Sequence, residues 1–265
     1  MIKTPLHPFG TAVSGFDIQQ LGAAPAVPVF TELARLVAAS RVVVFRMQTL
    51  DDAAFVKFLA GFGNLTFTEG ETHVEAAPDL NVVSNVGRLT PARSVFHTDT
   101  SYMPCPPAFT ALRPVLLPAS GGDTLFTDQV GAAARLPEKV RRFLMGRSLL
   151  HQVSGLDGQD QATRQPLFRR HPITGEVSLY LSTPKRCTGL SGVDARTSQR
   201  IIAALYWHST RARVQYRHVW RAGDVLMWDN RVSMHKADHD KLTQDRVLHR
   251  GMVGGEPPLA AFLPT

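Results

Sequence analysis

The chain has 265 residues and a formal net charge of +7, from 29 Lys and Arg against 22 Asp and Glu. This length allows a sizeable core and is common for one β-barrel or β-sandwich domain, so we expect residues 1–265 to form a single domain. The densest basic stretches, 135–147 and 211–221, are interpreted as solvated faces of a helix and a strand, because they form no continuous basic footprint with base-stacking aromatic residues. The composition therefore predicts no nucleic-acid partner.

The N-terminal part of the chain alternates helix and strand patterns. Apolar residues have helical spacing over 30–39, and the β-branched run 41–46 is typical of a buried strand. Asp51 and Asp52 cap a second predicted helix over 51–62, whose core-facing residues are Phe55, Phe58, Leu59 and Phe62. Gly61 and Gly63 close this segment.

From Leu80 onward, short apolar runs are separated by Pro and Gly. The runs that predict strands are 81–86, 108–117, 124–126 and 178–181, and helices are predicted at 136–150 and 197–211. Short strands with frequent turn signals favour a β-sandwich or barrel with helices inserted between strands. No repeat or linker divides the chain.

The cysteines and the N-terminus indicate the compartment. Only Cys105 and Cys187 occur, too few for a disulfide framework or a cysteine-rich zinc site, so we expect free thiols in a reducing compartment. The first residues lack an apolar targeting segment, and no apolar run is long enough to cross a membrane. These features predict a soluble, cytoplasmic protein without a membrane partner, and they leave a homo-oligomer open.

Two histidines and an aspartate form a candidate metal site. A strand through 96–99 would place His97 and Asp99 on one face, and His235 follows downstream. Two imidazoles and one carboxylate leave three neighbouring positions of an Fe(II) ion open, the ligand set of non-haem iron oxygenases. The segment 73–75 has the same His-x-carboxylate spacing but no matching motif downstream, so we expect a solvated strand or loop there.

Further motifs accompany these residues in a fixed order. They are Gly15-Phe16-Asp17, Val42-Val43-Val44-Phe45-Arg46, Gly61-Phe62-Gly63, Gly121-Gly122-Asp123-Thr124, Trp228-Asp229-Asn230-Arg231 and Arg246-Val247-Leu248-His249-Arg250. Together they resemble the taurine dioxygenase/TfdA family of Fe(II)- and 2-oxoglutarate-dependent dioxygenases over nearly the whole chain. The resemblance implies a mainly β fold with flanking helices, a double-stranded β-helix or cupin-like jelly-roll barrel. It implies Fe(II), 2-oxoglutarate and O2 as cofactors, with His97, Asp99 and His235 holding the catalytic iron.

The resemblance also assigns residues to the cosubstrate and the substrate. Arg246, eleven residues after His235, would bind the distal carboxylate of 2-oxoglutarate through its planar guanidinium, and Thr124 would donate a hydroxyl to the same carboxylate. Arg250 shares a strand face with Arg246 and would hold the anionic end of the primary substrate. Arg93 stands where relatives place a substrate-facing polar residue, with a solvated loop position as the equal alternative.

The implied reaction is hydroxylation of a small anionic substrate, such as a sulfonate, carboxylate or amino-acid derivative, with release of succinate and CO2. If the hydroxylated carbon bears a heteroatom, the product collapses and that bond is cleaved. Asp99 argues against halogenation, because halogenating relatives carry a small residue at this position. Thr68 and Glu71 stand where taurine-specific enzymes have His and Tyr, a difference that argues against taurine as the substrate.

Two other classes of protein remain as alternatives. A zinc-dependent hydrolase could use two His and one Asp, but it would leave Thr124 and Arg246 unexplained. A catalytically inactive, cupin-like binding module would be expected to lack a ligand or Arg246, and neither is missing. Four aromatic residues could line a pocket or belong to the core: Trp228, Tyr102, Phe96 and Phe109. Four further histidines form no second metal motif: His208, His218, His239 and His249.

Overall fold

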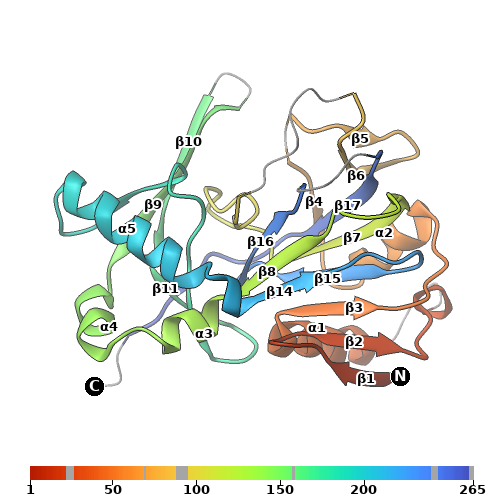
Figure 1. The fold of residues 1–265 in the computed structure, drawn as a ribbon, viewed down its shortest axis with the longest axis horizontal. Coiled ribbons are helices and arrows are strands. Elements are labelled where there is room, and N and C mark those ends of the chain that lie inside the picture. Colours follow the sequence, from red (N-terminus) through yellow and green to blue (C-terminus); the bar gives the residue numbers. More distant parts are fainter. Residues whose placement is uncertain (22–26, 69, 88–94, 157–158, 240–243, 263–265) are drawn as a thin grey trace.

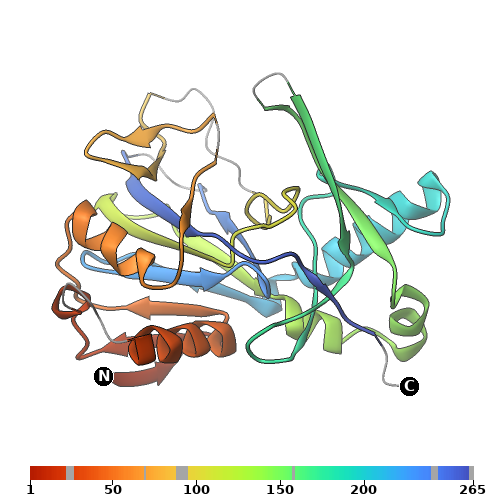
Figure 2. The same ribbon diagram turned by 180° about the vertical axis from the view of Figure 1, so that it is seen from behind.

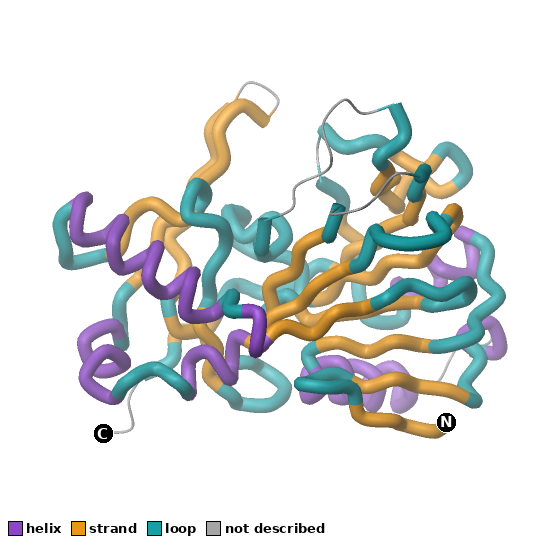
Figure 3. Tube along the Cα trace, viewed as in Figure 1, coloured by secondary structure: helices purple, strands orange, loops and turns teal. Residues whose placement is uncertain are grey.

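The fold is built mainly from strands, with helices packed against their outer faces (Figures 1 and 3). The computed structural model describes residues 1–21, 27–68, 70–87, 95–156, 159–239 and 244–262. The strands of a nine-stranded sheet follow the order β1 (Ile2–Pro5), β2 (Thr11–Ser14), β3 (Val42–Phe45), β15 (Val225–Asp229), β7 (Phe109–Leu116), β17 (Val247–Val253), β6 (Ala77–Ser84) and β5 (His73–Val74), and β4 (Leu65–Thr66) pairs with β17. A three-stranded sheet packs on it, with the order β14 (Gln215–His218), β8 (Thr124–Asp128) and β16 (Ser233–Ala237).

The two faces of the nine-stranded sheet bury two different cores. On β3, Val43 and Phe45 pack on the helix side, whereas Val42 and Val44 face the interior between the two sheets. Phe126 of β8 closes that interior from the opposite sheet. Since alternate residues of a strand point to opposite faces, burial on both sides explains why β3 is an uninterrupted apolar run.

Helices α1 (Val27–Ser40) and α2 (Asp52–Ala60) cover the outer face of the nine-stranded sheet, as Figures 1 and 2 show. The carboxylate of Asp51 accepts a hydrogen bond of 2.7 Å from the backbone N–H of Ala54, which caps α2 as predicted. The aromatic and aliphatic residues predicted for the core are buried or packed against it, namely Phe55, Phe58, Leu59 and Phe62. The predicted helices of this part are confirmed.

The other side of the molecule holds two small sheets and the remaining helices. One sheet contains β9 (Ser148–Leu156), β10 (Gln159–Pro166) and β13 (Cys187–Leu190), and the other contains β11 (Phe168–Arg170), β12 (Val177–Leu179) and β18 (Leu259–Ala260). Their apolar residues share a core with α3 (Gln129–Ala134), α4 (Glu138–Leu144) and α5 (Ala195–Ser209). Among the described helices, none has the length and apolar character needed to span a membrane.

The helix predicted over 136–150 is wrong in its second half. Helix α4 ends at Leu144, and Gly146 adopts a φ of 75°, a left-handed conformation that ends the helical path. Strand β9 then begins at Ser148, and Leu149 is fully buried in the core beneath the small sheets. Packing of this apolar residue on a strand therefore overrides the helical spacing.

Two further elements differ from the prediction. The stretch 211–221 contains the 3₁₀ turn η2 (Ala212–Val214) before β14, and Arg211, which precedes the turn, packs over the ring of Trp207 at the end of α5, 3.9 Å from its centroid. Helix α3 was not predicted, because its short Ala-rich sequence carries no periodic large apolar residues. Its start is nevertheless a local signal, since the carboxylate of Asp128 accepts a hydrogen bond of 3.0 Å from the N–H of Val130.

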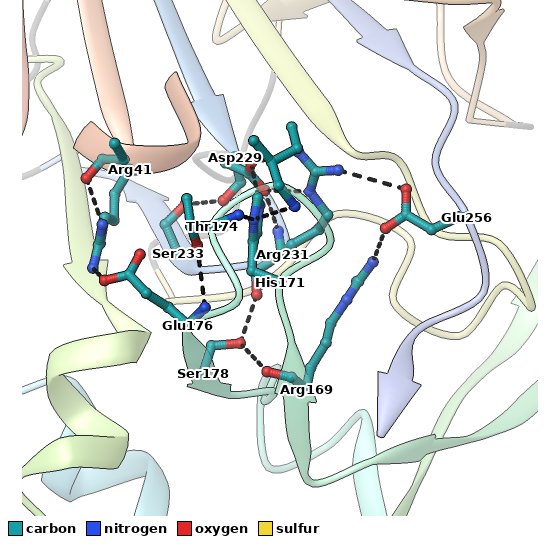
Figure 4. Close-up of polar contacts among 12 residues, drawn as sticks. Arg41, Arg169, His171, Thr174, Glu176, Ser178, Asp229, Arg231, Ser233 and Glu256 are labelled. Carbon is teal, nitrogen blue, oxygen red and sulfur yellow. Dashed lines mark hydrogen bonds and ion pairs between the residues drawn. The ribbon is translucent and has the colours of Figure 1, made fainter. Parts of the chain in front are cut away.

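A buried ion network joins β15 to the small sheet of β11 and β12 (Figure 4). The carboxylate of Asp229 lies 2.9 Å from Nε2 of His171 and 2.6 Å from Nη2 of Arg231, and all three side chains are almost inaccessible. Glu256 contacts Arg231 at 3.5 Å and the fully buried Arg169 at 2.8 Å. Burial opposes ionisation of Asp229, but the charge and hydrogen bonds of Arg231 and His171 hold its pKa well below the ordinary value.

We predict that Asp229→Ala lowers the free energy of unfolding by about 3–5 kcal/mol, because the buried guanidinium of Arg231 loses its nearest carboxylate and His171 loses its hydrogen-bond partner. Urea denaturation measures the change, and Glu138→Ala, which removes an exposed carboxylate paired with Arg141 and Arg142, should have a far smaller effect. Because the pKa of Asp229 is lowered, the contribution is complete above about pH 4 and is lost as the pH falls further. Equal losses in the two variants would contradict a structural role for this network.

Candidate active site

His97 and His235 are held side by side by their own backbones. Each backbone N–H donates to the other residue's carbonyl oxygen at 2.9 Å, which forms an isolated antiparallel bridge. The predicted strand through 96–99 does not form, since only His97 bridges and Asp99 lies in a turn. The hydroxyl of Thr98, which donates to the carbonyl oxygen of Leu181 at 2.8 Å, fixes the segment, so that Asp99 still faces the two histidines.

The three side chains converge on one point. The ligand atoms of His97, Asp99 and His235 all lie within 4.8 Å of one another. Nε2 of each histidine lies 3.7 Å from Oδ1 of Asp99, too far for a hydrogen bond. Nδ1–H of His97 donates to the carbonyl oxygen of Val95 at 2.9 Å, so the lone pair of its Nε2 points toward the carboxylate. This arrangement fits a metal ion between the three groups.

The protonation states also suit metal binding. Burial lowers the pKa of His97 and lowers that of His235 to about 3, so both imidazoles are neutral near pH 7. Burial alone would raise the pKa of Asp99, but the interactions with His235, Arg250 and His97 and a hydrogen bond from Thr110 lower it to about 2. The cluster therefore offers two neutral nitrogen ligands and one carboxylate.

A chain of hydrogen bonds orients Asp99 from behind. The hydroxyl of Thr110 donates to Oδ2 of Asp99 at 2.8 Å and accepts from Nδ2 of Asn230 at 2.7 Å. Oδ1 of Asn230 accepts in turn from Nε1 of Trp228 at 3.0 Å. All four residues are buried, so Oδ1 of Asp99 is left to face the histidines. The sequence motif around Trp228 and Asn230 thus orients Asp99, which lies far away in the chain.

Arg246 is a buried cation near this cluster. Its Nη2 donates to the hydroxyl oxygen of Thr124 at 3.4 Å, and Trp220 donates to the same oxygen at 3.1 Å. Within the described part of the chain, Nε of Arg246 has no hydrogen-bond partner, and burial lowers the pKa of its guanidinium to about 10. A desolvated guanidinium is stabilised by an anion, so this position fits the distal carboxylate of 2-oxoglutarate.

Arg250 lies between the metal cluster and the loop before β5. Its Nη1 lies 3.7 Å from Oδ1 of Asp99, and its Nη2 contacts the carboxylate of Glu71. Nη2 also donates to Thr68 and to Asn81, both at 3.3 Å. Arg246 directly precedes β17, and Arg250 lies four residues further along that strand, so both project to the same side of the sheet, as predicted.

A cavity of about 410 Å³ joins these groups, a volume typical of small-molecule sites. Its lining includes the predicted residues His97, Asp99, His235, Thr124, Arg246 and Arg250. Of the aromatic candidates, Trp228 and Tyr102 line the cavity, whereas Phe96 and Phe109 belong to the apolar cores. Arg93 lies outside the described residues.

Several residues at the site were not assigned by the sequence. Arg186 lines the cavity, stacks over the ring of Tyr102 at 5.0 Å from its centroid and donates to the carbonyl oxygen of Thr98 at 3.3 Å. No motif marks it, because it reaches the site from a loop between β12 and β13. The segment 73–75 does not belong to the cavity lining, and His97, Asp99 and His235 form the one metal-ligating group found among the described residues.

The fold and the cluster define a class of protein. A carboxylate and two neutral imidazoles lie beside a buried arginine that forms no salt bridge with the described residues, an arrangement that fits a non-haem iron oxygenase with an anionic cosubstrate. The family model described as "Taurine catabolism dioxygenase TauD, TfdA family" matches residues 3–252, and the chain belongs to this family. The protein is a dioxygenase that depends on Fe(II), 2-oxoglutarate and O2, as predicted.

Individual relatives agree with this assignment. The chain is 34% identical to an alpha-ketoglutarate-dependent sulfate ester dioxygenase of Pseudomonas putida, over 83% of this chain and 78% of the relative. It is 28% identical to an alpha-ketoglutarate-dependent 2,4-dichlorophenoxyacetate dioxygenase of Cupriavidus pinatubonensis, over 94% of this chain and 96% of the relative. A taurine dioxygenase structure from Burkholderia xenovorans superposes with a TM-score of 0.86 at 32% identity, covering 98% of this chain and 92% of that chain. This likeness confirms the cupin-like jelly-roll fold, and the comparisons favour a dioxygenase over a zinc hydrolase or an inactive binding module.

Proposed function

We propose that His97, Asp99 and His235 are the iron ligands and that Arg246 and Thr124 bind the distal carboxylate of 2-oxoglutarate. The observation that carries this proposal is the buried guanidinium of Arg246, which has no salt-bridge partner among the described residues although it lies in the same cavity as the triad. When bound, Fe(II) activates O2 so that 2-oxoglutarate becomes succinate and CO2 while one oxygen atom enters a C–H bond of the substrate.

The protein's own residues position these reactants. Thr110 holds Oδ2 of Asp99, which leaves Oδ1 directed toward the histidines. Thr124 accepts a hydrogen bond from Arg246, and the ring of Trp220 packs against the same guanidinium. These contacts hold the guanidinium in the orientation in which it would bind the cosubstrate. The walls of the cavity shield these groups from water, so the charge-assisted bonds to an anion are stronger than they would be in solvent.

The substrate in this proposal is a small organic anion whose charged end lies against Arg250. The relatives act on sulfate esters and on 2,4-dichlorophenoxyacetate, which share one anionic group and an apolar body. Apolar side chains of Val82, Leu112 and Val153 line the same cavity and suit such a body. We also propose that residues 1–265 form one domain, because the family model spans 3–252, and that the protein is cytoplasmic, with its two cysteines as free thiols.

The test combines binding and turnover. Under anaerobic conditions, Fe(II) and 2-oxoglutarate should give the visible charge-transfer absorption of the chelate. With O2, succinate formation should be stimulated by at least one of hexyl sulfate, hexanesulfonate, 2,4-dichlorophenoxyacetate or a carboxylate amino-acid derivative. Absence of the absorption, together with zinc-dependent hydrolysis of an ester, would refute the proposal.

We predict that Arg250→Ala weakens substrate binding by about 10- to 1,000-fold, because the substrate anion loses a largely buried partner. Binding of Fe(II) and 2-oxoglutarate should persist, since Arg246 and the triad are unchanged. The measurement is the substrate concentration that half-saturates succinate formation. Arg35→Ala, at an exposed position of α1, is the matched control and should leave this concentration unchanged. An unaltered value in Arg250→Ala would mean that the anion is held elsewhere.

A further inference from the structure

Glu71 places a carboxylate where the proposed substrate anion would bind. Its Oε2 contacts Nη2 of Arg250, and both residues line the cavity that holds the iron ligands. Thr68 and Asn81 accept hydrogen bonds from the same nitrogen. The guanidinium face turned toward the loop before β5 is therefore already occupied by oxygen acceptors of the protein.

The two arginines of this strand face differ in their charge partners. Arg246 forms no salt bridge within the described residues, whereas Arg250 has the carboxylate of Glu71 in contact and that of Asp99 at 3.7 Å. The carboxylate of Asp99 is directed toward the metal position, so Glu71 is the anion that compensates the largely buried Arg250. A substrate anion that approached Arg250 beside Glu71 would meet a like charge, which is unfavourable at short range.

Resting on the proposed function, we propose that Glu71 is a specificity-determining residue that pairs with Arg250 in the substrate-free protein and is displaced by the anionic end of the substrate. The side chain of Glu71 is 38% exposed, so its carboxylate can turn into solvent without crossing the core. The preceding Gly70 adopts a φ of 77° with open space around it, which leaves room for this movement. An anion that binds Arg250 less tightly than Glu71 does will not displace it. The site therefore selects substrates whose anionic group binds Arg250 tightly and whose organic part fits the cavity.

Glu71 could instead stay in place and bind a cationic group of the substrate, and this alternative can be distinguished from displacement. If Glu71 stayed in place, it would favour a zwitterionic substrate whose ammonium group pairs with it. Displacement is favoured at Nη2 of Arg250, because this nitrogen already contacts Glu71, Thr68 and Asn81, so an anion that binds there must replace one of them. Nε of Arg250 has no hydrogen-bond partner among the described residues, so an anion that displaces Glu71 gains a second donor on the same guanidinium. Of the three residues that Nη2 contacts, Glu71 alone carries a charge. Replacing its carboxylate with the anionic group of a substrate therefore preserves the charge balance around Arg250.

The experiment compares Glu71→Gln with Glu75→Gln, an identical substitution at an exposed position four residues further along the same loop and hairpin. Hexyl sulfate, hexanoate and taurine are titrated calorimetrically into the Fe(II)- and 2-oxoglutarate-loaded protein without O2. Glu71→Gln should bind hexyl sulfate about five- to tenfold more tightly than the wild type and discriminate less between sulfate and carboxylate. Glu75→Gln should match the wild type.

Unchanged or weaker binding of hexyl sulfate to Glu71→Gln overturns the inference, as does an absence of binding to both proteins. A selective loss of taurine binding would show that Glu71 pairs with a substrate ammonium group, which also overturns it. A turnover readout follows the same logic, because the half-saturating substrate concentration should fall while the maximal rate of succinate formation is retained. Failure of the wild type to form the 2-oxoglutarate chelate refutes the proposed function and is seen separately, before any anion is added.

Discussion

His235→Ala should reduce Fe(II) affinity by more than about 100-fold and abolish substrate-stimulated succinate formation. Nε2 of His235 is one of the three atoms that converge on the proposed metal position, and burial lowers the pKa of its imidazole to about 3, so the ring is neutral at physiological pH, as metal binding requires. Among the described residues, His97, Asp99 and His235 are the one group of His, Cys, Asp or Glu side chains found that could hold a metal ion. No fourth member of this group could take the place of His235. Anaerobic titration against a chelator of known affinity measures the loss.

The variant should nevertheless fold, because the contacts that join positions 97 and 235 are backbone hydrogen bonds that alanine retains. His73→Ala is the matched control, since His73 is exposed, stacks on the ring of Phe67 and does not belong to the cavity lining. It should bind Fe(II) like the wild type. Wild-type iron affinity in His235→Ala would show that the ion is held by other residues.

Arg246→Ala should retain Fe(II) but raise the dissociation constant of 2-oxoglutarate by about 30- to 1,000-fold. The guanidinium of Arg246 is buried and hydrogen-bonded to Thr124. Without it, the distal carboxylate of 2-oxoglutarate would be desolvated in the site and have no cation beside it. The dissociation constant is obtained from the charge-transfer absorption as 2-oxoglutarate is added to the Fe(II) protein without O2.

Arg246→Lys separates charge from geometry at this position. Lysine keeps the positive charge but cannot form two parallel hydrogen bonds to a carboxylate, so its affinity for 2-oxoglutarate should lie between those of Arg246→Ala and the wild type. Arg35→Ala, on the exposed face of α1, should not change the affinity. A wild-type dissociation constant in Arg246→Ala would remove this residue from the cosubstrate site.

Local interactions made much of the fold predictable from the sequence. The N-terminal cap of α2 is a contact between Asp51 and Ala54, three residues apart, and the spacing of Phe55, Phe58 and Leu59 repeats at the helical period. The strand β3 is buried on both faces, so its side chains are all apolar. The sequence also proposed the triad and the two arginines as site residues, because their types and spacings resemble a family motif, and the structure brings these residues together at one cavity.

Tertiary packing decided the contacts between residues distant in the chain. Asn230 supports Asp99 only because β15 pairs with β7 in the register that sets Trp228 opposite Thr110. The end of α4 was set by the burial of Leu149 on strand β9 rather than by helical spacing.

The contact between Arg250 and Glu71 also could not be predicted from the sequence. The sequence by itself marked Arg250 as an anion-binding residue and marked Glu71 only as a departure from the taurine-specific pattern. Their contact arises because β17 pairs with β6 and the loop before β5 folds over that edge. Spacing along a chain encodes interactions within one helix or strand, whereas the pairing of charges 179 residues apart depends on sheet register and loop path, which only the folded structure determines.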